Sequence, residues 1–289
     1  MLDPKVLTTI KDLPLLAKTV VDGFMNGFNK STVKGPGLEF SQYRSYQPGD
    51  DLRWLDWRMF ARSDRYYIRE SEIETSISVR FLVDASASMD HEDNGIKKID
   101  YARYLTASLA YLANLQGDAV GLYVFQNGGL FSLASRADPQ HLKRLYYQLE
   151  QVKPAGKFTQ PVHYKELFTG ANRKELLIFI TDMYQQDGEI SKLLDSLAAL
   201  KHEVIVFQVM GQNELDLDFK GFSTLEDLET GETIQISPQQ AQAYKQNLQQ
   251  HLAGIRMELL GKHIVHRIIS TAEPLDKALR DFLVQRNKS

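Results

Sequence analysis

One stretch sets the class of the fold: Val79-Arg80-Phe81-Leu82-Val83-Asp84-Ala85-Ser86-Ala87-Ser88. Residues 79–83 form a short, mostly apolar run, which predicts a buried β-strand. Asp84, Ser86 and Ser88 follow at alternate positions, directly after that strand. Because ligands of open α/β sheets bind at the carboxyl ends of the strands, this loop is the first place to expect a binding site.

Downstream of Asp84, strand-like and helix-like segments alternate along the chain. The predicted strands cover residues 119–125, 130–133, 176–181, 204–209 and 263–269, and the predicted helices cover 102–112, 138–151, 190–200, 237–259 and 271–283, the last capped by Thr271. Asn127-Gly128-Gly129 predicts an antiparallel hairpin between the first two of these strands, and Thr230-Gly231-Glu232 predicts a second, shorter hairpin. The alternation predicts an α/β fold with a mostly parallel sheet and helices on both faces.

The first 75 residues differ in character from the rest. Apolar residues at helical spacing between residues 4 and 28 predict one amphipathic N-terminal helix. Residues 30–75 hold both tryptophans, Trp54 and Trp57, together with turn motifs and arginines that alternate with acids. We therefore expect a small irregular and β-rich subdomain, and an organisation with an accessory segment at residues 1–75 and an α/β domain at residues 76–289.

Composition argues against several functional classes. The formal net charge of -3 predicts neither a nucleic-acid binder nor a polybasic membrane binder. The arginines and aromatic rings of residues 30–75 would suit single-stranded nucleic acid, but the interleaved acids would repel phosphate. The chain has no cysteine, which excludes thiolate zinc sites and cysteine nucleophiles. No signal peptide and no apolar run of roughly 18–20 residues is present, so we expect a soluble, cytoplasmic protein without a transmembrane segment.

Five side chains make up a candidate metal site: Asp84, Ser86, Ser88, Thr159 and Asp182. Asp182 follows a second apolar strand, and Thr159 lies in a glycine-containing loop. Carboxylate and hydroxyl oxygens are hard ligands that suit Mg²⁺ or Mn²⁺. The alternatives are structural, with Ser86, Ser88 or Asp182 capping a helix and Thr159 serving as an ordinary loop hydroxyl.

The order and spacing of these five residues resemble the metal-ion-dependent adhesion site of von Willebrand factor A domains. The resemblance covers about residues 76–210 and is weakest around Thr159, which lacks the usual glycine-threonine context. It implies a Rossmann-like α/β fold. It also implies a divalent ion that Asp84, Ser86, Ser88, Thr159 and Asp182 hold with a position left open for the carboxylate of a partner.

A narrower resemblance covers nearly the whole chain. The motifs that carry it are Gly35-x-Gly37-x-Glu39-Phe40, Arg44-x-Tyr46, Pro48-Gly49-Asp50-Asp51-x-Arg53, Asp56-Trp57, Ala61-Arg62 and Arg69-Glu70. They resemble the domain of unknown function 58 family, a bacterial family whose members are often encoded beside MoxR-type AAA+ ATPases. The resemblance implies an accessory or adaptor role with such an ATPase and supplies no settled reaction.

An enzyme is the alternative to a binding protein. A phosphatase of the haloacid dehalogenase type would use Asp84 as the nucleophile with Mg²⁺, but it needs a second acid two residues on, where this chain has Ser86. The sequence also has no G-x-S-x-G elbow, no H-E-x-x-H motif and no Walker A lysine loop. We therefore predict a metal-dependent protein-interaction protein that is not an enzyme, with a Mg²⁺-dependent phosphatase-like hydrolase as the alternative.

Overall fold

The computed structural model describes residues 3–30, 42–47, 57–70, 76–159, 174–200, 202–216, 223–236 and 238–286. The chain divides into two compact units, one formed by residues 1–25 with 76–289 and the other by residues 26–75. The division at residue 75 coincides with the boundary that the sequence suggested. The first 25 residues, however, join the larger unit, which we call the α/β domain.

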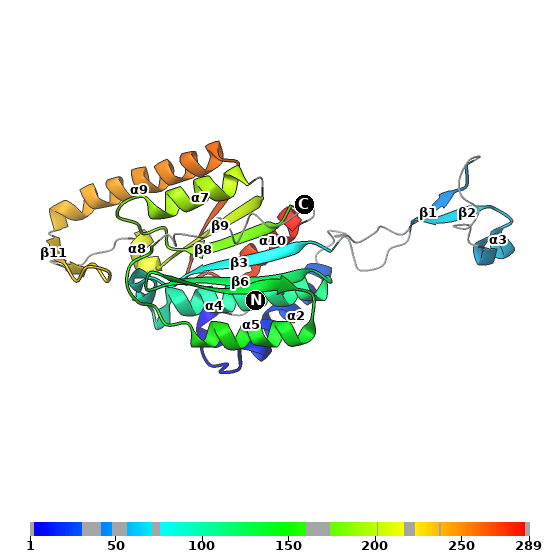
Figure 1. The fold of residues 1–289 in the computed structure, drawn as a ribbon, viewed down its shortest axis with the longest axis horizontal. Coiled ribbons are helices and arrows are strands. Elements are labelled where there is room, and N and C mark those ends of the chain that lie inside the picture. The colour runs from blue at the N-terminus through cyan, green and yellow to red at the C-terminus, as the bar shows by residue number, and fades with distance from the viewer. Residues whose placement is uncertain are drawn as a thin grey trace. The chain divides into compact units, whose positions relative to one another are not determined.

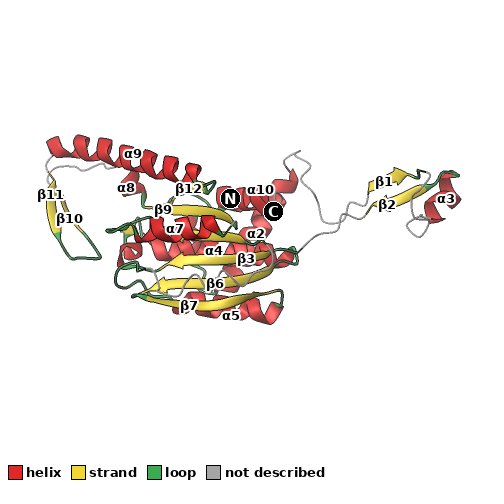
Figure 2. Cartoon of the chain, turned by 45° about the horizontal axis from the view of Figure 1, so that its top comes forward, coloured by secondary structure: helices red, strands yellow, loops and turns green. Residues whose placement is uncertain are grey.

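A six-stranded sheet forms the centre of the α/β domain, in the order β12-β9-β8-β3-β6-β7. Its strands are β3 (Ser78–Asp84), β6 (Ala119–Gln126), β7 (Gly129–Arg136), β8 (Leu176–Thr181), β9 (Glu203–Met210) and β12 (Val265–Ser270). All neighbours are parallel except β6 and β7, which form an antiparallel pair. Figure 2 shows neighbouring strands side by side with helices around them. The predicted α/β class and mostly parallel sheet are confirmed.

The path of the chain through the sheet places the Asp84 loop (residues 84–88) at a switch point. From β3 the chain moves outward through β6 to the edge strand β7, and it then returns to β8 on the other side of β3. The carboxyl ends of β3 and β8 therefore flank the position where the winding direction reverses, which is where open α/β sheets bind ligands.

Helices cover both faces of the sheet (Figure 1). On one face lie α2 (Leu13–Lys30), α4 (Lys98–Leu115) and α5 (Pro139–Gln151), and on the other lie α7 (Glu189–Ala199) and α9 (Pro238–Gly261). The final helix, α10 (Asp276–Arg286), packs against α4. This layered arrangement is the one that the resemblance to von Willebrand factor A domains implied. Within the described residues, no helix is both long enough and apolar enough to cross a membrane.

Helix α7 illustrates how a helical apolar stripe forms the core. Ile190, Leu193 and Leu197 lie at helical spacing and are fully buried, against Leu177 and Phe179 of β8. Burial of each such side chain contributes about 1.5–3 kcal/mol to folding. All six residues of β8 are buried, and Asp182 follows at the end of that strand.

The sequence predicted one continuous N-terminal helix, and this prediction is wrong. The structure has two helices, α1 (Pro4–Leu7) and α2, separated by residues 8–12. The cause is Pro14, which lacks an N–H and therefore fits only the first turn of a helix. Asp12 caps that turn, because its Oδ1 accepts a 3.3 Å hydrogen bond from the N–H of Leu15.

Both predicted hairpins are present. Asn127 and Gly128 have φ values of 47° and 73°, the left-handed pair that joins β6 to β7. The second hairpin pairs β10 (Ser223–Glu226) with β11 (Thr233–Ile236). The described residues of the domain also form a 3₁₀ helix η2 (Ala87–Asp90), a small hairpin of β4 (Glu92–Asp93) and β5 (Ile96–Lys97), and a helix α8 (Gln212–Asp216). Thr271 does not cap α10, which begins five residues later; its N–H donates to the carbonyl of Met210 at the end of β9.

Where the structure describes it, the second unit contains an antiparallel pair of strands, β1 (Gln42–Ser45) and β2 (Tyr67–Glu70), and the helix α3 (Trp57–Ser63). Phe60 and Tyr66 stack with ring centroids 4.4 Å apart, so aromatic residues pack against each other within this unit. Short β structure beside loops agrees with the predicted subdomain. Trp54 and the motifs between residues 35 and 40 and between 48 and 53 lie outside the described residues.

Candidate metal site

The Asp84 loop is fixed by backbone hydrogen bonds on two sides. The N–H of Ala85 donates to the carbonyl of Phe125 in β6 at 2.8 Å. The N–H of Ala87 donates to the carbonyl of Gly156 at 2.8 Å, and the N–H of Ala155 donates back to Ala85 at 3.0 Å. The loop around residues 155–156 therefore lies beside the Asp84 loop, and the two support each other.

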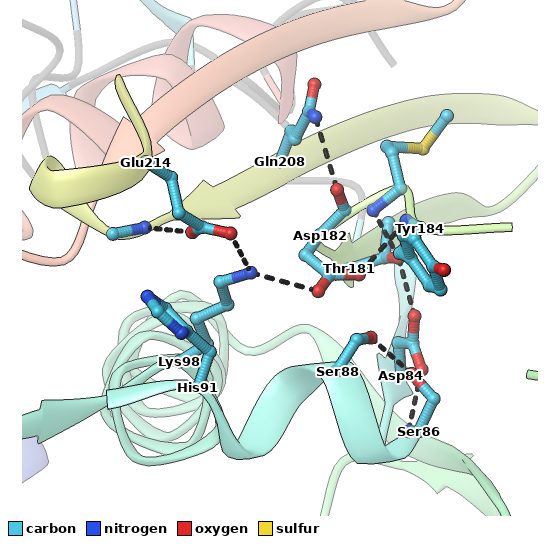
Figure 3. A network of polar contacts seen from close by, with 12 residues as sticks. Asp84, Ser86, Ser88, His91, Lys98, Thr181, Asp182, Tyr184, Gln208 and Glu214 are labelled. Carbon is cyan, nitrogen blue, oxygen red and sulfur yellow. Dashed lines mark hydrogen bonds and ion pairs between the residues drawn. The ribbon is translucent and has the colours of Figure 1, made fainter. Parts of the chain in front are cut away.

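Asp84 is completely buried at the end of the central strand. Its Oδ1 accepts a 2.9 Å hydrogen bond from the N–H of Ser86, and its Oδ2 accepts a 2.6 Å hydrogen bond from the hydroxyl of Thr181 (Figure 3). Both donors are neutral, and in the described part of the chain no lysine or arginine forms an ion pair with this carboxylate. Burial, with a further contribution from the charge of Asp182, raises the pKa of Asp84 to about 7.

Ser86 and Ser88 present their hydroxyls to each other, with the two Oγ atoms 3.0 Å apart. Ser86 stands at the N-cap position of η2, but its side chain makes no capping hydrogen bond. The capping interpretation of Ser86 is therefore not supported, and its hydroxyl is directed to the site.

Asp182 follows β8 and lies on the same side of the sheet as Asp84 (Figure 3). Its Oδ1 accepts a 3.0 Å hydrogen bond from the N–H of Tyr184, and its Oδ2 lies 3.1 Å from the Nζ of Lys98. The next helix, α7, begins only at Glu189, so Asp182 does not cap it.

Lys98, at the start of α4, places a buried positive charge beside the site. Besides its contact with Asp182, its Nζ lies 2.8 Å from Oε1 of Glu214 in α8. The other oxygen of Glu214 accepts a 2.6 Å hydrogen bond from the N–H of Gly211. Lys98 thus connects α4, the end of β8 and α8 through one side chain (Figure 3).

Thr159 is exposed, and its hydroxyl donates to the carbonyl of Lys157 at 3.1 Å. The hydrogen bonds of the described residues do not join it to Asp84, Ser86, Ser88 or Asp182. Its role as a ligand stays a prediction. The threonine that contacts the site directly is Thr181, which sequence reasoning assigned only to the end of a buried strand.

Glu229 is the second site residue that the sequence analysis missed. It lies in the turn of the β10–β11 hairpin, and its Oε1 is buried without a hydrogen-bond partner among the described residues. Burial, followed by the charges of Asp84 and Asp182, raises the pKa of Glu229 to about 7. The negative charges of Asp84, Asp182 and Glu229 therefore act on one another in this part of the domain.

The residues present fit a hard divalent ion. In the parts of the chain that the structure describes, no three histidines, cysteines or acids are arranged to hold an ion by themselves, so any ion here depends on hydroxyl ligands as well. Asp84, Ser86, Ser88 and Asp182 supply such a mixed oxygen set. Such a set of hard oxygen ligands suits Mg²⁺ or Mn²⁺.

Comparison with known proteins finds relatives without an assigned activity. The uncharacterized proteins Rv1480 of Mycobacterium tuberculosis and Mb1516 of Mycobacterium bovis are each 27% identical over 240 residues, which is 81% of this chain and 74% of theirs. Among solved structures, the conserved hypothetical protein BatB from Bacteroides thetaiotaomicron shares 18% identity with a TM-score of 0.49, covering 74% of this chain and 100% of that one. The SpRpn10 VWA domain shares 10% identity with a TM-score of 0.42, covering 73% of this chain and 95% of that one.

The family relationship follows from the sequence itself. The family described as "Protein of unknown function DUF58" matches residues 42–254, which is well over half of the chain. The match covers residues 42–75 of the second unit and most of the α/β domain, including Asp84, Ser86, Ser88 and Asp182. The chain is therefore a member of the DUF58 family.

Proposed function

We propose that this protein is a metal-dependent interaction protein that binds a carboxylate of a protein partner. Asp84, Ser86, Ser88 and Asp182 would hold Mg²⁺ or Mn²⁺, with Thr159 as the fifth predicted ligand. The observation that carries the proposal is the state of Asp84, a fully buried carboxylate whose hydrogen-bond donors are all neutral, beside two hydroxyl oxygens 3.0 Å apart. Burying an uncompensated carboxylate is costly unless a cation accompanies it.

The surrounding groups set the orientation of the ligands. The Thr181 hydroxyl and the Ser86 N–H each engage one oxygen of Asp84, which fixes the plane of the carboxylate. The N–H of Tyr184 fixes Asp182 in the same way. A divalent ion held by such a set would supply an electrophilic position that an incoming anionic oxygen can occupy.

Lys98 favours recognition of an anion. Its ammonium neutralises part of the charge of Asp182, and the serine hydroxyls are neutral. The ligand set therefore carries less negative charge than two free carboxylates would, and it would leave more of a bound ion's charge available to a carboxylate from a partner.

We further propose that the partner is a MoxR-type AAA+ ATPase or its client. Support for this choice is the resemblance of the chain to a family whose members are often encoded beside such ATPases. The phosphatase alternative gains no support from the site, because the residue two positions after Asp84 is Ser86, whose hydroxyl contacts Ser88 where a general acid would be needed.

The test measures association with the MoxR-type ATPase of the same organism by biolayer interferometry. We expect binding in Mg²⁺ that EDTA abolishes, that Ser86→Ala weakens and that Ser132→Ala, an exposed serine on β7, leaves unchanged. A parallel assay follows hydrolysis of an aryl phosphate by the wild type and by Ser86→Asp. EDTA-insensitive association together with Mg²⁺-dependent turnover by the wild type would overturn the proposal in favour of a phosphatase.

A further inference from the structure

The strand β7 ends the six-stranded sheet on one side, and among the described elements it pairs only with β6. The N–H and C=O groups along the other side of such a strand can pair with a further strand. Natural edge strands are commonly protected by charges or proline, yet β7 has no proline, and its one charged residue, Arg136, stands at its end. The register with β6 is regular over residues 129–133, so this stretch presents an ordinary strand edge.

A groove of about 440 Å³ lies between β7 and α5. Figure 2 shows β7 as the outermost strand, with α5 next to it. Phe131 and Leu133 of β7 and Tyr147 of α5 line the groove. The two aromatic side chains are 39% and 59% exposed, respectively. They offer an incoming strand apolar contact area that the fold itself leaves in water.

Lys143 and Arg144 of α5 make this groove positively charged. Both side chains are exposed, and no acid is among the residues that line the groove. Within the described part of the chain, neither of them forms an ion pair. The positive charge is local, because the chain as a whole has a net charge of -3. The groove therefore favours an occupant that brings acidic as well as apolar side chains.

We propose that the β7 edge and its groove bind an extended acidic segment of a partner protein, which adds to the sheet as a further strand. Backbone hydrogen bonds to β7 would supply affinity, and the rings and cations of the groove would supply selectivity. This surface lies at the sheet edge, whereas Asp84 ends the central strand β3, and its occupant needs no metal ion. A second copy of this chain fits less well, because antiparallel pairing of two β7 strands would bring the cations of the two copies toward each other.

The probe is a fluorescein-labelled eight-residue peptide in which pairs of glutamates alternate with phenylalanine–valine pairs, so that each face of the extended peptide carries acidic and apolar side chains. Fluorescence anisotropy in EDTA should show saturable binding to the full-length wild type, and a peptide with lysine in place of glutamate should not bind. Lys143→Glu and Phe131→Ala should each weaken binding about three- to tenfold. The matched control is Lys245→Glu, an exposed lysine of α9 on the other face of the sheet, which should leave binding unchanged.

Two backbone-methylated forms of the peptide test the pairing itself. An added strand directs only alternate N–H groups at its neighbour, so methylation of one alternate set should abolish binding and methylation of the other set should leave it largely intact. Equal effects of the two sets, no saturable binding by the wild type, or full-strength binding by Lys143→Glu would overturn the proposal.

The remaining outcomes would identify a different occupant or a different site. Tighter binding of an oligothymidylate, or a wild-type dimer in sedimentation that Phe131→Ala dissociates, would also overturn the proposal. Peptide binding that requires Mg²⁺ and is lost in Asp84→Ala would put the peptide at the candidate metal site. That result would support the proposed function and overturn this inference, so the two can fail separately.

Discussion

Lys98 and Asp182 form an ion pair of 3.1 Å in which both side chains are almost completely buried, at 5% and 3% exposure. The pair joins the start of α4 to the end of β8, next to the candidate metal site. A buried charge is stable only with its partner, and removal of one member leaves the other uncompensated. Lys98 is therefore part of the charge balance of the site as well as of the fold.

The first prediction concerns Lys98→Met. This change removes the cation shared by Asp182 and Glu214, so it should lower the free energy of unfolding by about 3–5 kcal/mol in EDTA. Added Mn²⁺ should raise the free energy of unfolding of Lys98→Met by more than it raises that of the wild type, because a bound ion would replace the missing charge. The measurement is urea unfolding followed by circular dichroism.

The control for this prediction is the neighbouring Lys97→Met. Lys97 pairs with Asp90 on the surface, where both side chains are more than a third exposed, so the change should cost less than about 1 kcal/mol. Equal losses in the two variants would show that the buried ion pair has no special role.

The second prediction is a pH dependence that originates in Asp84. Its pKa in the folded protein is raised to about 7 by burial and by Asp182, above the usual 3.8. The folded state therefore favours the protonated form. Without metal, the contribution of Asp84 to stability should be fully present below about pH 4 and should be lost as the pH rises through about 7.

The variant Asp84→Asn tests this origin directly. It should be more stable than the metal-free wild type at pH 8, by at least about 1 kcal/mol, and the advantage should vanish near pH 4. Thermal unfolding across this range in EDTA measures the effect, with the exposed Asp90→Asn as the control. A constant difference at every pH would show that the ionisation of Asp84 is not responsible.

The third prediction concerns Thr181→Val. The change keeps the shape of the side chain but removes the donor to Asp84 and the acceptor for the N–H of Met183. It should lower the free energy of unfolding by about 1–3 kcal/mol, and it should weaken Mn²⁺ binding because Asp84 loses the group that orients it. Thr106→Val is the matched control, since this equally buried hydroxyl bonds only within α4 and its loss should leave metal binding unchanged.

The order of elements was readable from the sequence because burial imposes a simple pattern. β3 and β8 are short apolar runs, and α7 carries a stripe at helical spacing, so each had one plausible structure. The prediction of one continuous N-terminal helix was wrong because the apolar spacing continues across Pro14. Only the backbone chemistry of proline interrupts the helix there.

The sequence predicted only part of the candidate site, namely the residues that directly follow buried strands. Asp84, Ser86, Ser88 and Asp182 follow strands, so the strand ends pointed to them. Lys98 carried a signal that was overlooked, since it lies on the same helical face as Ala102 and Leu105, which are buried. Glu229 carried none: it stands in a polar turn far along the chain, and only the tertiary fold brings its carboxylate near enough to feel the charges of Asp84 and Asp182.

The fourth prediction examines Thr159, the ligand that the sequence suggested and the structure leaves at the surface. If Thr159 joins the metal site when an ion binds, Thr159→Val should weaken Mn²⁺ binding while leaving the stability of the metal-free protein unchanged, because its hydroxyl contacts only a loop carbonyl. Unchanged Mn²⁺ affinity would remove Thr159 from the ligand set. Calorimetry and thermal unfolding on the same samples separate the two effects.

The most direct test of the account is calorimetric titration of the full-length protein with Mn²⁺, compared with Asp84→Ala. Thermal unfolding of both proteins beforehand confirms that the variant is folded. The account predicts one binding site in the wild type and none in the variant, because Asp84 is the buried carboxylate at the centre of the site. Binding of Mn²⁺ to Asp84→Ala with wild-type affinity would contradict it.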